Sequence, residues 1–342
     1  MDPAVTTRAT GRAARAGVAA AALALGACSD RSPSALDPKG PAAERIAEVW
    51  WLMLALAVAV YLVVAGLIMV ASRRGRGTEG EAEGQDGQRP LNENAFIWVG
   101  GIAVPAVILL VLAVVTVSST AELTRADEGA LRIEVEGYKW WWEVRYPEGG
   151  FVTANEVHVP VGRPVEIELT TADVIHSFWV PELAGKVDLI PEQRNVLRLT
   201  ANEPGEYRGQ CAEFCGLQHA RMAFLVIADP PAEFDAWVER HRAPPPEPPP
   251  GPATEGEEIF VRSSCAGCHT VRGTSAQGQA GPDLSDFGSR RTIGAATVEN
   301  SRANLGGWIV DAQSLKPGNL MPPVSLESEE LQALIAYLES RR

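Results

Sequence analysis

Two long apolar runs restrict the possible fold more strongly than any other feature of this sequence. Residues 49–72 and 95–119 contain no charged side chain. At about 1.5 Å per residue, the first run forms a helix of about 36 Å, which is long enough to cross the hydrocarbon core of a membrane. A buried helical hairpin inside a soluble protein is the alternative. We predict a transmembrane helical hairpin over residues 49–119.

The segment between the two runs indicates how the hairpin is oriented. It begins with the sequence RRGRG, residues 73–77, and arginines beside a span mark the cytoplasmic side of a membrane. We therefore expect loop 73–94 to be cytoplasmic. Everything that follows residue 119 is then predicted to lie on the extracytoplasmic, periplasmic side.

The first residues of the chain have the features of an export signal. Arginines precede an apolar run, residues 17–28, that is too short to span a bilayer comfortably. The run ends in the sequence LGAC, which resembles the lipobox of bacterial lipoproteins, in which the cysteine is lipidated. An ordinary signal peptide with a chance cysteine is the alternative. We predict a signal peptide over residues 1–27, lipidation of Cys28, an exported linker over 28–48 and a place in the bacterial plasma membrane.

A proline-rich segment divides the exported part into two domains. Residues 242–253 are dominated by proline, and such sequences form stiff, extended linkers. Residues 120–241, before this linker, predict an antiparallel β-sandwich, because they contain several segments with period-two alternation or β-branched runs. These segments are residues 131–146, 155–171, 195–200 and 222–229.

The part after the linker has a different pattern. Residues 254–342 contain helical patterns at 255–263, 297–311 and 328–342, which predict an all-α domain. The chain is therefore expected to be a membrane-anchored multidomain protein with a two-helix hairpin, an all-β domain and an all-α domain.

The charge of the chain and the positions of its cysteines limit its function. The net charge is −13, which argues against nucleic-acid binding and suggests that any partners are cationic. Of the five cysteines, Cys28 stands alone and the other four form two close pairs, each near a histidine. This arrangement indicates cofactor ligation rather than a framework of disulfides.

The sequence CAEFCGLQHARM brings two cysteines, a histidine and a methionine close together. A disulfide between Cys211 and Cys215 would give no reason for His219 and Met222 to follow at this spacing. A zinc site is a second option, but methionine is not a usual zinc ligand. Thiolate, thioether and imidazole together are the ligands of copper electron-transfer sites. His176 is available upstream, and two cysteines with two histidines are enough for two coppers bridged by both sulfurs.

The sequence CAGCH is the signature of covalent haem c attachment. In this motif the thiols of Cys265 and Cys268 add to the haem vinyl groups, and His269 becomes an iron ligand. Downstream, KPGNLMPP supplies Met321 as the second axial ligand, and with the preceding GPDL it resembles class I cytochrome c domains. Iron with both axial positions filled suits electron transfer rather than oxygen chemistry.

Four motifs follow the two spans in a defined order: GYKWWW, HSFWVP, KVDLIP and CAEFCGLQHARM. Spans and motifs together are similar to subunit II of haem–copper cytochrome c oxidases over residues 40–240. The resemblance implies a cupredoxin sandwich on a transmembrane hairpin, with a class I cytochrome c domain fused behind it. It also implies a dinuclear copper centre, CuA, whose ligands would be His176, Cys211, the backbone carbonyl of Glu213, Cys215, His219 and Met222.

The resemblance implies further roles for single residues. Trp140 in GYKWWW matches the family tryptophan that receives an electron from cytochrome c. The side chain of Glu213 is expected to face a magnesium ion at the border with subunit I, and Lys186 and Asp188 match polar residues near that border. Many members have a glutamate at the mouth of a proton path where this chain has Ala95. The resemblance therefore assigns no proton-entry role to this position.

Three other aromatic residues have weaker assignments. His158 and His241 lie outside every motif, and we expect them to be ordinary surface or strand residues. Trp308 is similar in placement to a cytochrome c tryptophan near a haem propionate, although a plain core position would explain it nearly as well.

Together these features imply subunit II of a terminal cytochrome c oxidase, an oxidoreductase. An external donor, such as a cytochrome c or a bc1-type complex, would deliver electrons to haem c and from there to CuA. Subunit I, accompanied by subunit III, would reduce oxygen to water coupled to proton translocation. The alternatives are the corresponding subunit of a CuA-containing nitric oxide reductase and a stand-alone membrane-anchored redox carrier. A quinol oxidase is disfavoured because such relatives lose the copper ligands.

Overall fold

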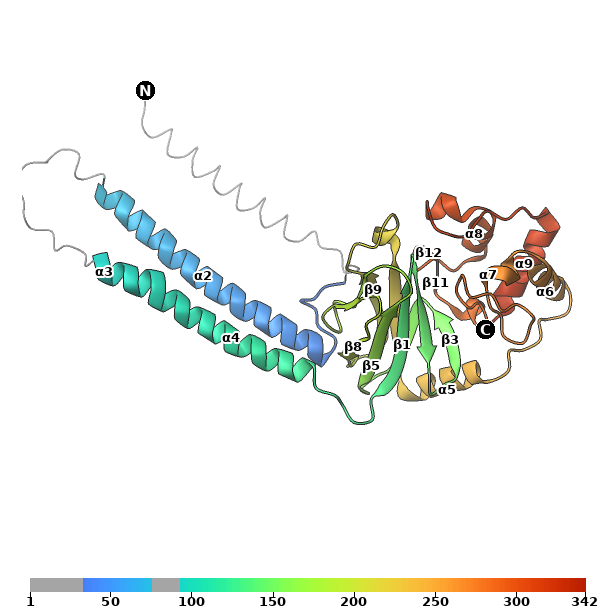
Figure 1. Ribbon diagram of the computed structural model, residues 1–342, viewed down its shortest axis with the longest axis horizontal. Coiled ribbons are helices and arrows are strands. Elements are labelled where there is room, and N and C mark those ends of the chain that lie inside the picture. Colours follow the sequence, from blue (N-terminus) through green and yellow to red (C-terminus); the bar gives the residue numbers. More distant parts are fainter. Residues whose placement is uncertain (1–32, 76–92) are drawn as a thin grey trace, which may run out of the picture.

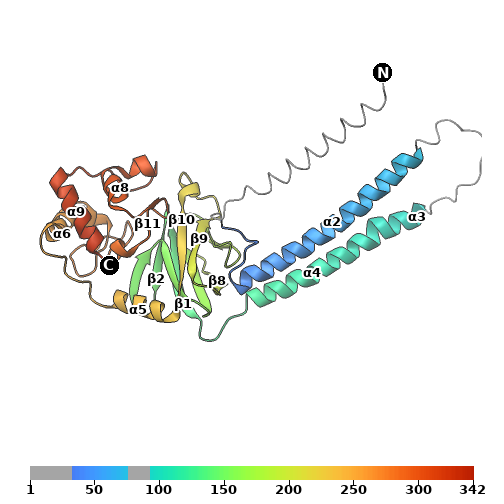
Figure 2. The ribbon, with the colours of Figure 1, turned by 180° about the vertical axis from the view of Figure 1, so that it is seen from behind.

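The computed structural model describes residues 33–75 and 93–342. The predicted signal peptide, Cys28 and most of the predicted cytoplasmic loop therefore lie outside the described residues. Within the described part, a helical hairpin, a β-sandwich and a helical domain follow one another along the molecule (Figure 1). The sandwich lies between the hairpin and the helical domain, as both ribbon views show (Figure 2).

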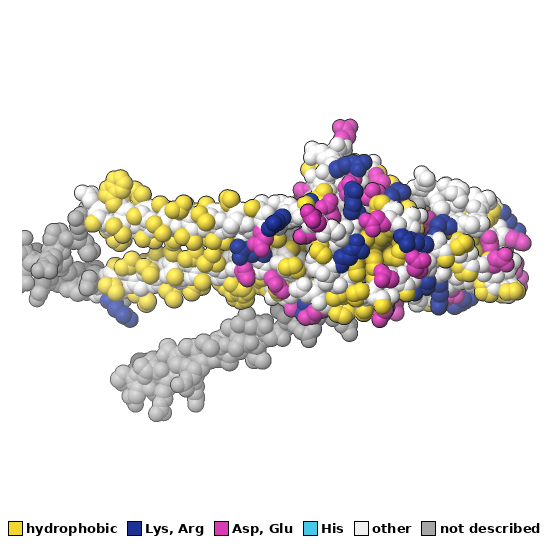
Figure 3. All heavy atoms as spheres, turned by 90° about the horizontal axis from the view of Figure 1, so that it is seen from below, with side chains coloured by type: hydrophobic (Ala, Val, Ile, Leu, Met, Phe, Trp, Pro, Cys, Tyr) yellow, Lys and Arg dark blue, Asp and Glu magenta, His cyan; other side chains and the backbone are white. Residues whose placement is uncertain are grey.

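The two predicted apolar runs form two long helices that lie side by side. Helix α2 covers Pro41–Gly75, and the second helix is built from α3 (Glu93–Phe96), a π-helical stretch η1 (Ile97–Ala103) and α4 (Val104–Leu123). Both are long and apolar enough to cross a membrane. Hydrophobic side chains cover the hairpin in the view from below, whereas charged side chains gather on the domains (Figure 3). This is the surface that a lipid-embedded hairpin requires.

The π-helical stretch has a local cause. Proline has no backbone N–H, so Pro105 cannot donate the usual helical hydrogen bond, and the turn before it widens. The Val104 N–H accordingly donates to the carbonyl of Val99, five residues earlier. The π-helical stretch is therefore the local response of the helix to Pro105.

The foot of the hairpin packs on the sandwich. Helix α2 begins several residues before the apolar run, and Ala43 and Ala47 in its first turns are buried. The preceding Gly40 lies so close to the carbonyl of Thr200 that a Cβ atom would be 2.1 Å from that oxygen. The Lys39 N–H donates to Glu182 at 2.7 Å. These contacts fix the angle at which the hairpin leaves the sandwich.

Ten strands form the two sheets of the sandwich, in the orders β3-β2-β1-β5-β8 and β4-β10-β9-β6-β7. The bounds of the first sheet are β1 Leu131–Tyr138, β2 Trp141–Tyr146, β3 Phe151–Ala154, β5 Val165–Thr171 and β8 Asn195–Leu199. Those of the second are β4 Glu156–Pro160, β6 His176–Trp179, β7 Val187–Leu189, β9 Gly205–Cys211 and β10 Ala223–Asp229. The predicted two-layer sandwich is confirmed.

The predicted antiparallel pairing holds for most neighbouring strands of the sandwich but not for two pairs. Strands β1 and β5 pair in parallel, and so do β4 and β10. Between β1 and β5 the chain adds two strands to the same sheet and crosses to the other one, so it returns in the original direction. Side chains alternate with the same period in parallel and antiparallel strand pairs. The alternation in the sequence therefore could not reveal whether two neighbouring strands run in the same direction.

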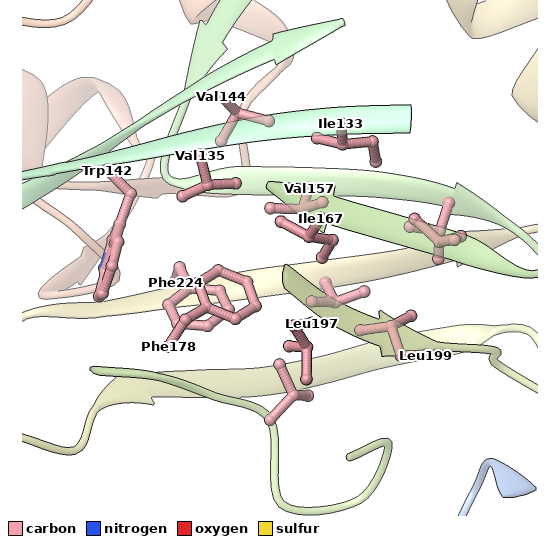
Figure 4. Close-up of a cluster of buried hydrophobic side chains, with 14 of the residues drawn as sticks. Ile133, Val135, Trp142, Val144, Val157, Ile167, Phe178, Leu197, Leu199 and Phe224 are labelled. Carbon is pink, nitrogen blue, oxygen red and sulfur yellow. The ribbon is translucent and has the colours of Figure 1, made fainter. Parts of the chain in front are cut away.

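The core between the sheets ends in an aromatic cluster (Figure 4). The ring of Trp142 meets those of Phe178 and Phe224 edge-on, and the two phenylalanine rings stack 4.1 Å apart. All three side chains are fully buried. His176 lies beside Trp142, with ring centroids 5.9 Å apart. The aromatic cluster therefore forms a rigid base under one end of β6.

The C-terminal domain is built mainly of helices. Its elements are α6 Pro252–Arg262, α7 Cys265–Cys268, η3 Phe287–Ser289, β11 Thr292–Ile293, β12 Val298–Glu299, α8 Arg302–Leu315 and α9 Ser328–Ser340. Helices α6 and α9 pack closely, because Gly256 has no side chain to separate it from the carbonyl of Ala333. Helix α5 (Pro231–Arg242) ends the sandwich domain and precedes the proline linker. The predicted helical domain is confirmed, with one additional two-stranded ladder.

Candidate copper centre and haem cavity

The loop between β9 and β10 carries most of the predicted copper ligands. Cys211 is the last residue of β9, and its N–H donates to the carbonyl of Met222 at 2.8 Å, which closes the loop at its base. Gly216 has a φ of 112°, a conformation that residues with a side chain rarely adopt. His176 begins the neighbouring strand β6, which pairs with β9. Paired strands thus bring His176 beside the loop.

Every predicted copper ligand converges in this region. The sulfurs of Cys211 and Cys215 are 3.7 Å apart, so they are not joined in a disulfide, whose bond is about 2.05 Å. The other distances from these two sulfurs are Cys211 to His176 Nδ1 3.9 Å, Cys211 to the Glu213 carbonyl 3.2 Å, Cys215 to His219 Nδ1 3.7 Å and Cys215 to Met222 Sδ 3.7 Å. Two sulfurs therefore stand at the centre, with the other donors around them.

The donors are well suited to a soft metal. Cys211, Cys215, Met222 and His176 are all buried, and His219 is half-buried. Buried thiolate, thioether and imidazole groups prefer copper to hard cations such as magnesium. Among the described residues, His176 and the two cysteines form a group whose ligand atoms all lie within 4.8 Å of one another. The residues present thus fit a copper centre.

The two thiols cannot both ionise easily without added positive charge. The hydrogen bond between the two sulfurs lowers the pKa of Cys211 and raises the pKa of Cys215 well above its ordinary value. A second thiolate would lie buried beside the first, and burial of unpaired charge is costly. Metal ions bound between the sulfurs would supply the missing positive charge.

Asp173 is a functional residue that the sequence motifs did not single out. Its carboxylate lies 2.9 Å from Nε2 of His176, so the other ring nitrogen, Nδ1, faces the sulfur of Cys211. A carboxylate in this position fixes the orientation of a metal-binding imidazole. The sequence did contain a signal for this role, because Asp173 lies only three residues before His176, the first residue of β6.

Glu213, predicted to face magnesium, and Lys186 and Asp188, predicted to lie near the subunit I border, are not brought together by any described contact. The carboxylate of Glu213 accepts a hydrogen bond from the N–H of Phe214 at 3.1 Å. Lys186 is exposed directly before β7, and Asp188 is half-exposed within this strand. None of the described contacts joins Glu213 to either of these residues.

Trp140 lies between the copper loop and the C-terminal domain. Its indole Nε1 donates to the carbonyl of Cys215 at 3.0 Å, and its ring packs against Gly216. Trp140 is also among the residues that line a cavity of about 320 Å³, whose other walls come mainly from the C-terminal domain. Trp140 therefore contacts both the copper loop and this cavity.

The cavity collects every predicted haem ligand. Its walls include Cys265, Cys268, His269 and Met321, together with apolar side chains such as Phe260, Leu284, Leu305 and Leu334. Helix α7 places both thiols within one turn. An apolar cavity with two thiols and two axial ligands on its walls fits a covalently bound haem.

Neighbouring groups hold each predicted axial ligand. Nδ1 of His269 lies 2.8 Å from the carbonyl of Pro282, which leaves Nε2 as the ligand atom, and burial lowers the pKa of this histidine and favours the neutral form. Gly281 packs against the imidazole, where a Cβ would come within 2.6 Å. The carbonyl of Met321 accepts from Gln313 at 3.0 Å. Trp308 also lines the cavity.

Buried charged groups connect the two domains. The carboxylate of Asp286 accepts hydrogen bonds from Thr153 at 2.6 Å and from Arg290, and it lies 3.3 Å from Nε2 of His241. We call these four residues the Asp286 cluster. Burial raises the pKa of Asp286, but Arg290 and His241 lower it more strongly, so the net pKa lies well below its ordinary value. The cluster thus holds a buried carboxylate ionised between the domains.

The prediction for His241 is wrong, because this residue is buried at the domain interface. Its ring packs on Trp237, with centroids 4.2 Å apart, and it contacts Asp286 of the other domain. No local pattern shows that the end of α5 faces the C-terminal domain. His158 is a half-buried strand residue, as expected, and its ring stacks on Trp237.

A second buried carboxylate and a buried lysine complete the interface. Glu156 accepts from the N–H groups of Arg291 and Thr292 at 2.6 and 3.1 Å, and burial raises its pKa to about 7. Lys316 is 2% exposed, and burial lowers its pKa to about 7. The domains are therefore joined by specific polar contacts rather than by the linker alone.

Comparison with known proteins gives consistent matches over both exported domains. Residues 151–229 match the family "Cytochrome C oxidase subunit II, periplasmic domain", and residues 253–342 match the family "Cytochrome c". Cytochrome c oxidase subunit 2 of Alkalihalophilus pseudofirmus is 38% identical over 322 residues, which is 92% of this chain and 92% of that protein. The proteins of the same name from Bacillus sp. PS3 and Bacillus subtilis are 36% and 31% identical, covering 78% and 93% of this chain and 79% and 94% of theirs.

Proposed function

The chain belongs to the family of cytochrome c oxidase subunit II, and on this premise we propose that Trp140 carries electrons from its haem domain to its copper loop. The family assignment makes the chain a subunit of an oxidoreductase, with a copper domain and a fused cytochrome c domain. The finer assignments, namely which residues hold each cofactor and which path the electron takes, are our proposal.

We assign the copper centre to the carbonyl of Glu213 and the side chains of His176, Cys211, Cys215, His219 and Met222. The support is their convergence around two sulfurs that lie 3.7 Å apart. We assign haem c to Cys265 and Cys268 as covalent attachments, with His269 and Met321 as axial ligands. When bound, the copper pair and the haem each supply a one-electron redox couple.

The surrounding residues orient these ligands and exclude water. Asp173 holds the ring of His176, the Pro282 carbonyl holds that of His269, and the aromatic cluster supports the copper loop from below. Preorganised ligands change little when an electron arrives, which favours fast transfer. The contact of Trp140 with both sites is the single observation that carries the proposed path.

The remaining functional assignments follow from the family. We propose that the hairpin anchors the chain in the bacterial plasma membrane with both domains on the periplasmic side, where Cys28 is lipidated. Subunit I would receive the electrons and reduce oxygen with proton translocation, and subunit III would accompany it. We place magnesium beside Glu213 at the subunit I border, and a cytochrome c or bc1-type complex as the donor.

Electron transfer within the full chain tests the proposed path. Rapid photoreduction of the haem should be followed by reduction of copper within the same molecule. Replacement of Trp140 by leucine should slow this step while both absorption spectra stay the same. Trp141→Leu is the matched control, because Trp141 also lines the cavity but stacks on Tyr138 instead of contacting the copper loop. Equal rates in the wild type and Trp140→Leu would contradict the proposed path.

A further inference from the structure

We infer that Lys316 is a positioning residue that locks the haem domain onto the copper domain and so fixes the distance over which the electron moves. This inference rests on the proposed function, because it concerns the same transfer from haem domain to copper loop. Lys316 does not itself carry an electron or a proton. It sets where Trp140 and the copper loop lie relative to the haem cavity.

Lys316 reaches three different segments from one buried position. It follows α8 directly, and its side chain is 2% exposed. Its Nζ donates to the carbonyls of Trp140 at 2.9 Å, Arg221 at 2.8 Å and Gly294 at 2.8 Å. Trp140 and Arg221 belong to the copper domain, whereas Gly294 belongs to the haem domain. One ammonium group therefore joins both domains.

Every N–H donor of the Lys316 ammonium group has an acceptor, which makes the contact between the two domains specific. An ammonium group has three N–H donors, and here each finds one carbonyl oxygen at normal hydrogen-bond distance. No carboxylate is among its described partners. A buried lysine that lacked these acceptors would be strongly destabilising, so the haem domain fits the copper domain in one orientation only.

The three carbonyls lie at key points of the electron path. Trp140 is the residue whose indole donates to Cys215, and Arg221 immediately precedes the copper ligand Met222. Gly294 packs against the ring of Trp308 in the cavity wall. The segment that starts at Lys316 leads within five residues to Met321. A shift of Lys316 would therefore change the distance between the copper loop and the haem cavity.

Neighbouring contacts support the same arrangement on both sides of Lys316. Gln218 of the copper loop donates to the carbonyl of Pro317, and Arg221 donates to the carbonyl of Leu315 at 2.5 Å. Copper-loop side chains therefore bind the backbone immediately before and after the lysine. The copper domain recognises residues 315–317 as one continuous segment.

The transfer that this arrangement serves is balanced without further reactants. With both cofactors bound, the haem would give up one electron and the copper pair would take up the same electron, so oxidation and reduction balance. No bond is formed or broken, and no proton has to move. A protein can accelerate such a step by holding donor and acceptor in place, which is the role assigned to Lys316.

Chemical modification of the unaltered full chain tests the burial of Lys316. The chain has four lysines, Lys39, Lys139, Lys186 and Lys316, so reductive methylation followed by mass spectrometry can assign each one. We expect the exposed Lys186 to be methylated rapidly and Lys316 to be protected until the protein is unfolded. Methylation of Lys316 at the rate of Lys186 in the folded chain would overturn the inference.

Substitution of Lys316 tests its effect on electron transfer. In the full chain carrying both cofactors, Lys316→Met should slow haem-to-copper transfer about tenfold or more, because loss of a buried hydrogen-bonded charge lowers the population of the docked arrangement. The rate should also become dependent on solvent viscosity, which a purely local effect would not produce. Lys316→Arg, which keeps the charge and the donors, should restore most of the rate.

A control variant and the wild type distinguish failure of this inference from failure of the proposed function. Lys39→Met removes a positive charge outside both sites, where the Lys39 ammonium lies beside Asp37 and Glu203, so its rate should be unchanged. A Lys316→Met variant that transfers electrons at the wild-type, viscosity-independent rate would overturn the inference alone. Absence of haem-to-copper transfer in the wild type would instead overturn the proposed function.

Discussion

The copper loop and the haem cavity organise their ligands in opposite ways. The copper ligands approach one another directly, with distances of 3.2–3.9 Å between each central sulfur and its neighbours. They come from strands and a loop held by the core of a sandwich. The haem ligands instead lie on the walls of a cavity of about 320 Å³ and come from short helices and loops. We therefore expect the sandwich to keep its fold without the metal and the haem domain to depend on its cofactor.

This difference implies different dependence on the cofactor. A metal ion between donors that already converge adds stability to a fold that exists without it. A haem, in contrast, takes the place of core side chains. The predictions below test this comparison and then the contacts that join the two regions.

The largest expected effect is the loss of haem attachment. Without haem, the apolar side chains that line the cavity would lose their packing partner, and loss of such packing is strongly destabilising. Cys265→Ser with Cys268→Ser should therefore abolish hydrogen-exchange protection in α6, α8 and α9. Cys211→Ser with Cys215→Ser is the matched pair and should leave the sandwich strands protected. Loss of protection in both domains would show that the comparison is wrong.

The next effect concerns the Asp286 cluster. Removing one member of a buried ion pair leaves the other without a partner and costs about 3–5 kcal/mol. Asp286→Ala should lower the free energy of unfolding of the haem domain by about this amount in denaturant titrations. Because the pKa of Asp286 is lowered, its contribution is present above the ordinary carboxyl pKa and is lost as the pH falls through the lowered value.

An exposed ion pair provides the control for Asp286. Glu239 pairs with Arg242 on the surface of α5, and such pairs contribute about 0–1 kcal/mol. Glu239→Ala should therefore change the stability very little. An equally small change for Asp286→Ala would mean that the cluster does not hold the domains together.

The pH dependence of Glu156 gives a smaller effect. Its pKa is raised to about 7, so the folded protein binds a proton that the unfolded chain loses at lower pH. The contribution of Glu156 is then fully present below the ordinary carboxyl pKa and is lost as the pH rises through about 7, by up to about 3 kcal/mol. Thermal unfolding between pH 5 and about pH 8 should show this slope in the wild type, and Glu156→Gln should flatten it. An unchanged slope in the variant would exclude Glu156 as its source.

The smallest effect concerns the orientation of His176. Substitution of a group that holds a metal-binding imidazole lowers metal affinity about tenfold to a hundredfold. Asp173→Asn should weaken copper binding within this range, as measured by competition with a chelator of known affinity. Asp188→Asn, on the neighbouring strand β7, should bind copper as the wild type does. Equal affinities in the two variants would remove Asp173 from the copper site.

Local sequence patterns could predict the parts of this protein that depend on local spacing. The apolar runs predicted the hairpin, and CAGCH and CAEFCGLQHARM predicted most members of each ligand set, because these members lie within one turn or one loop. His176 and Met321 lie outside these two motifs and were predicted from separate segments. The direction of strand pairing, the Asp286 cluster and Lys316 could not be predicted. Thr153 and Asp286 are 133 residues apart, and Lys316 and Trp140 are 176 apart. Such contacts depend on how two domains pack, which alternation and motif spacing do not encode.

The electron paramagnetic resonance spectrum of the full chain loaded with copper tests the central claim most directly. If Cys211 and Cys215 together hold a preformed two-copper centre, the spectrum should show one unpaired electron shared equally by two copper nuclei. Replacement of Cys215 by serine should abolish that signal. A spectrum from a single copper nucleus in the wild type would contradict the two-sulfur centre and the electron path that depends on it.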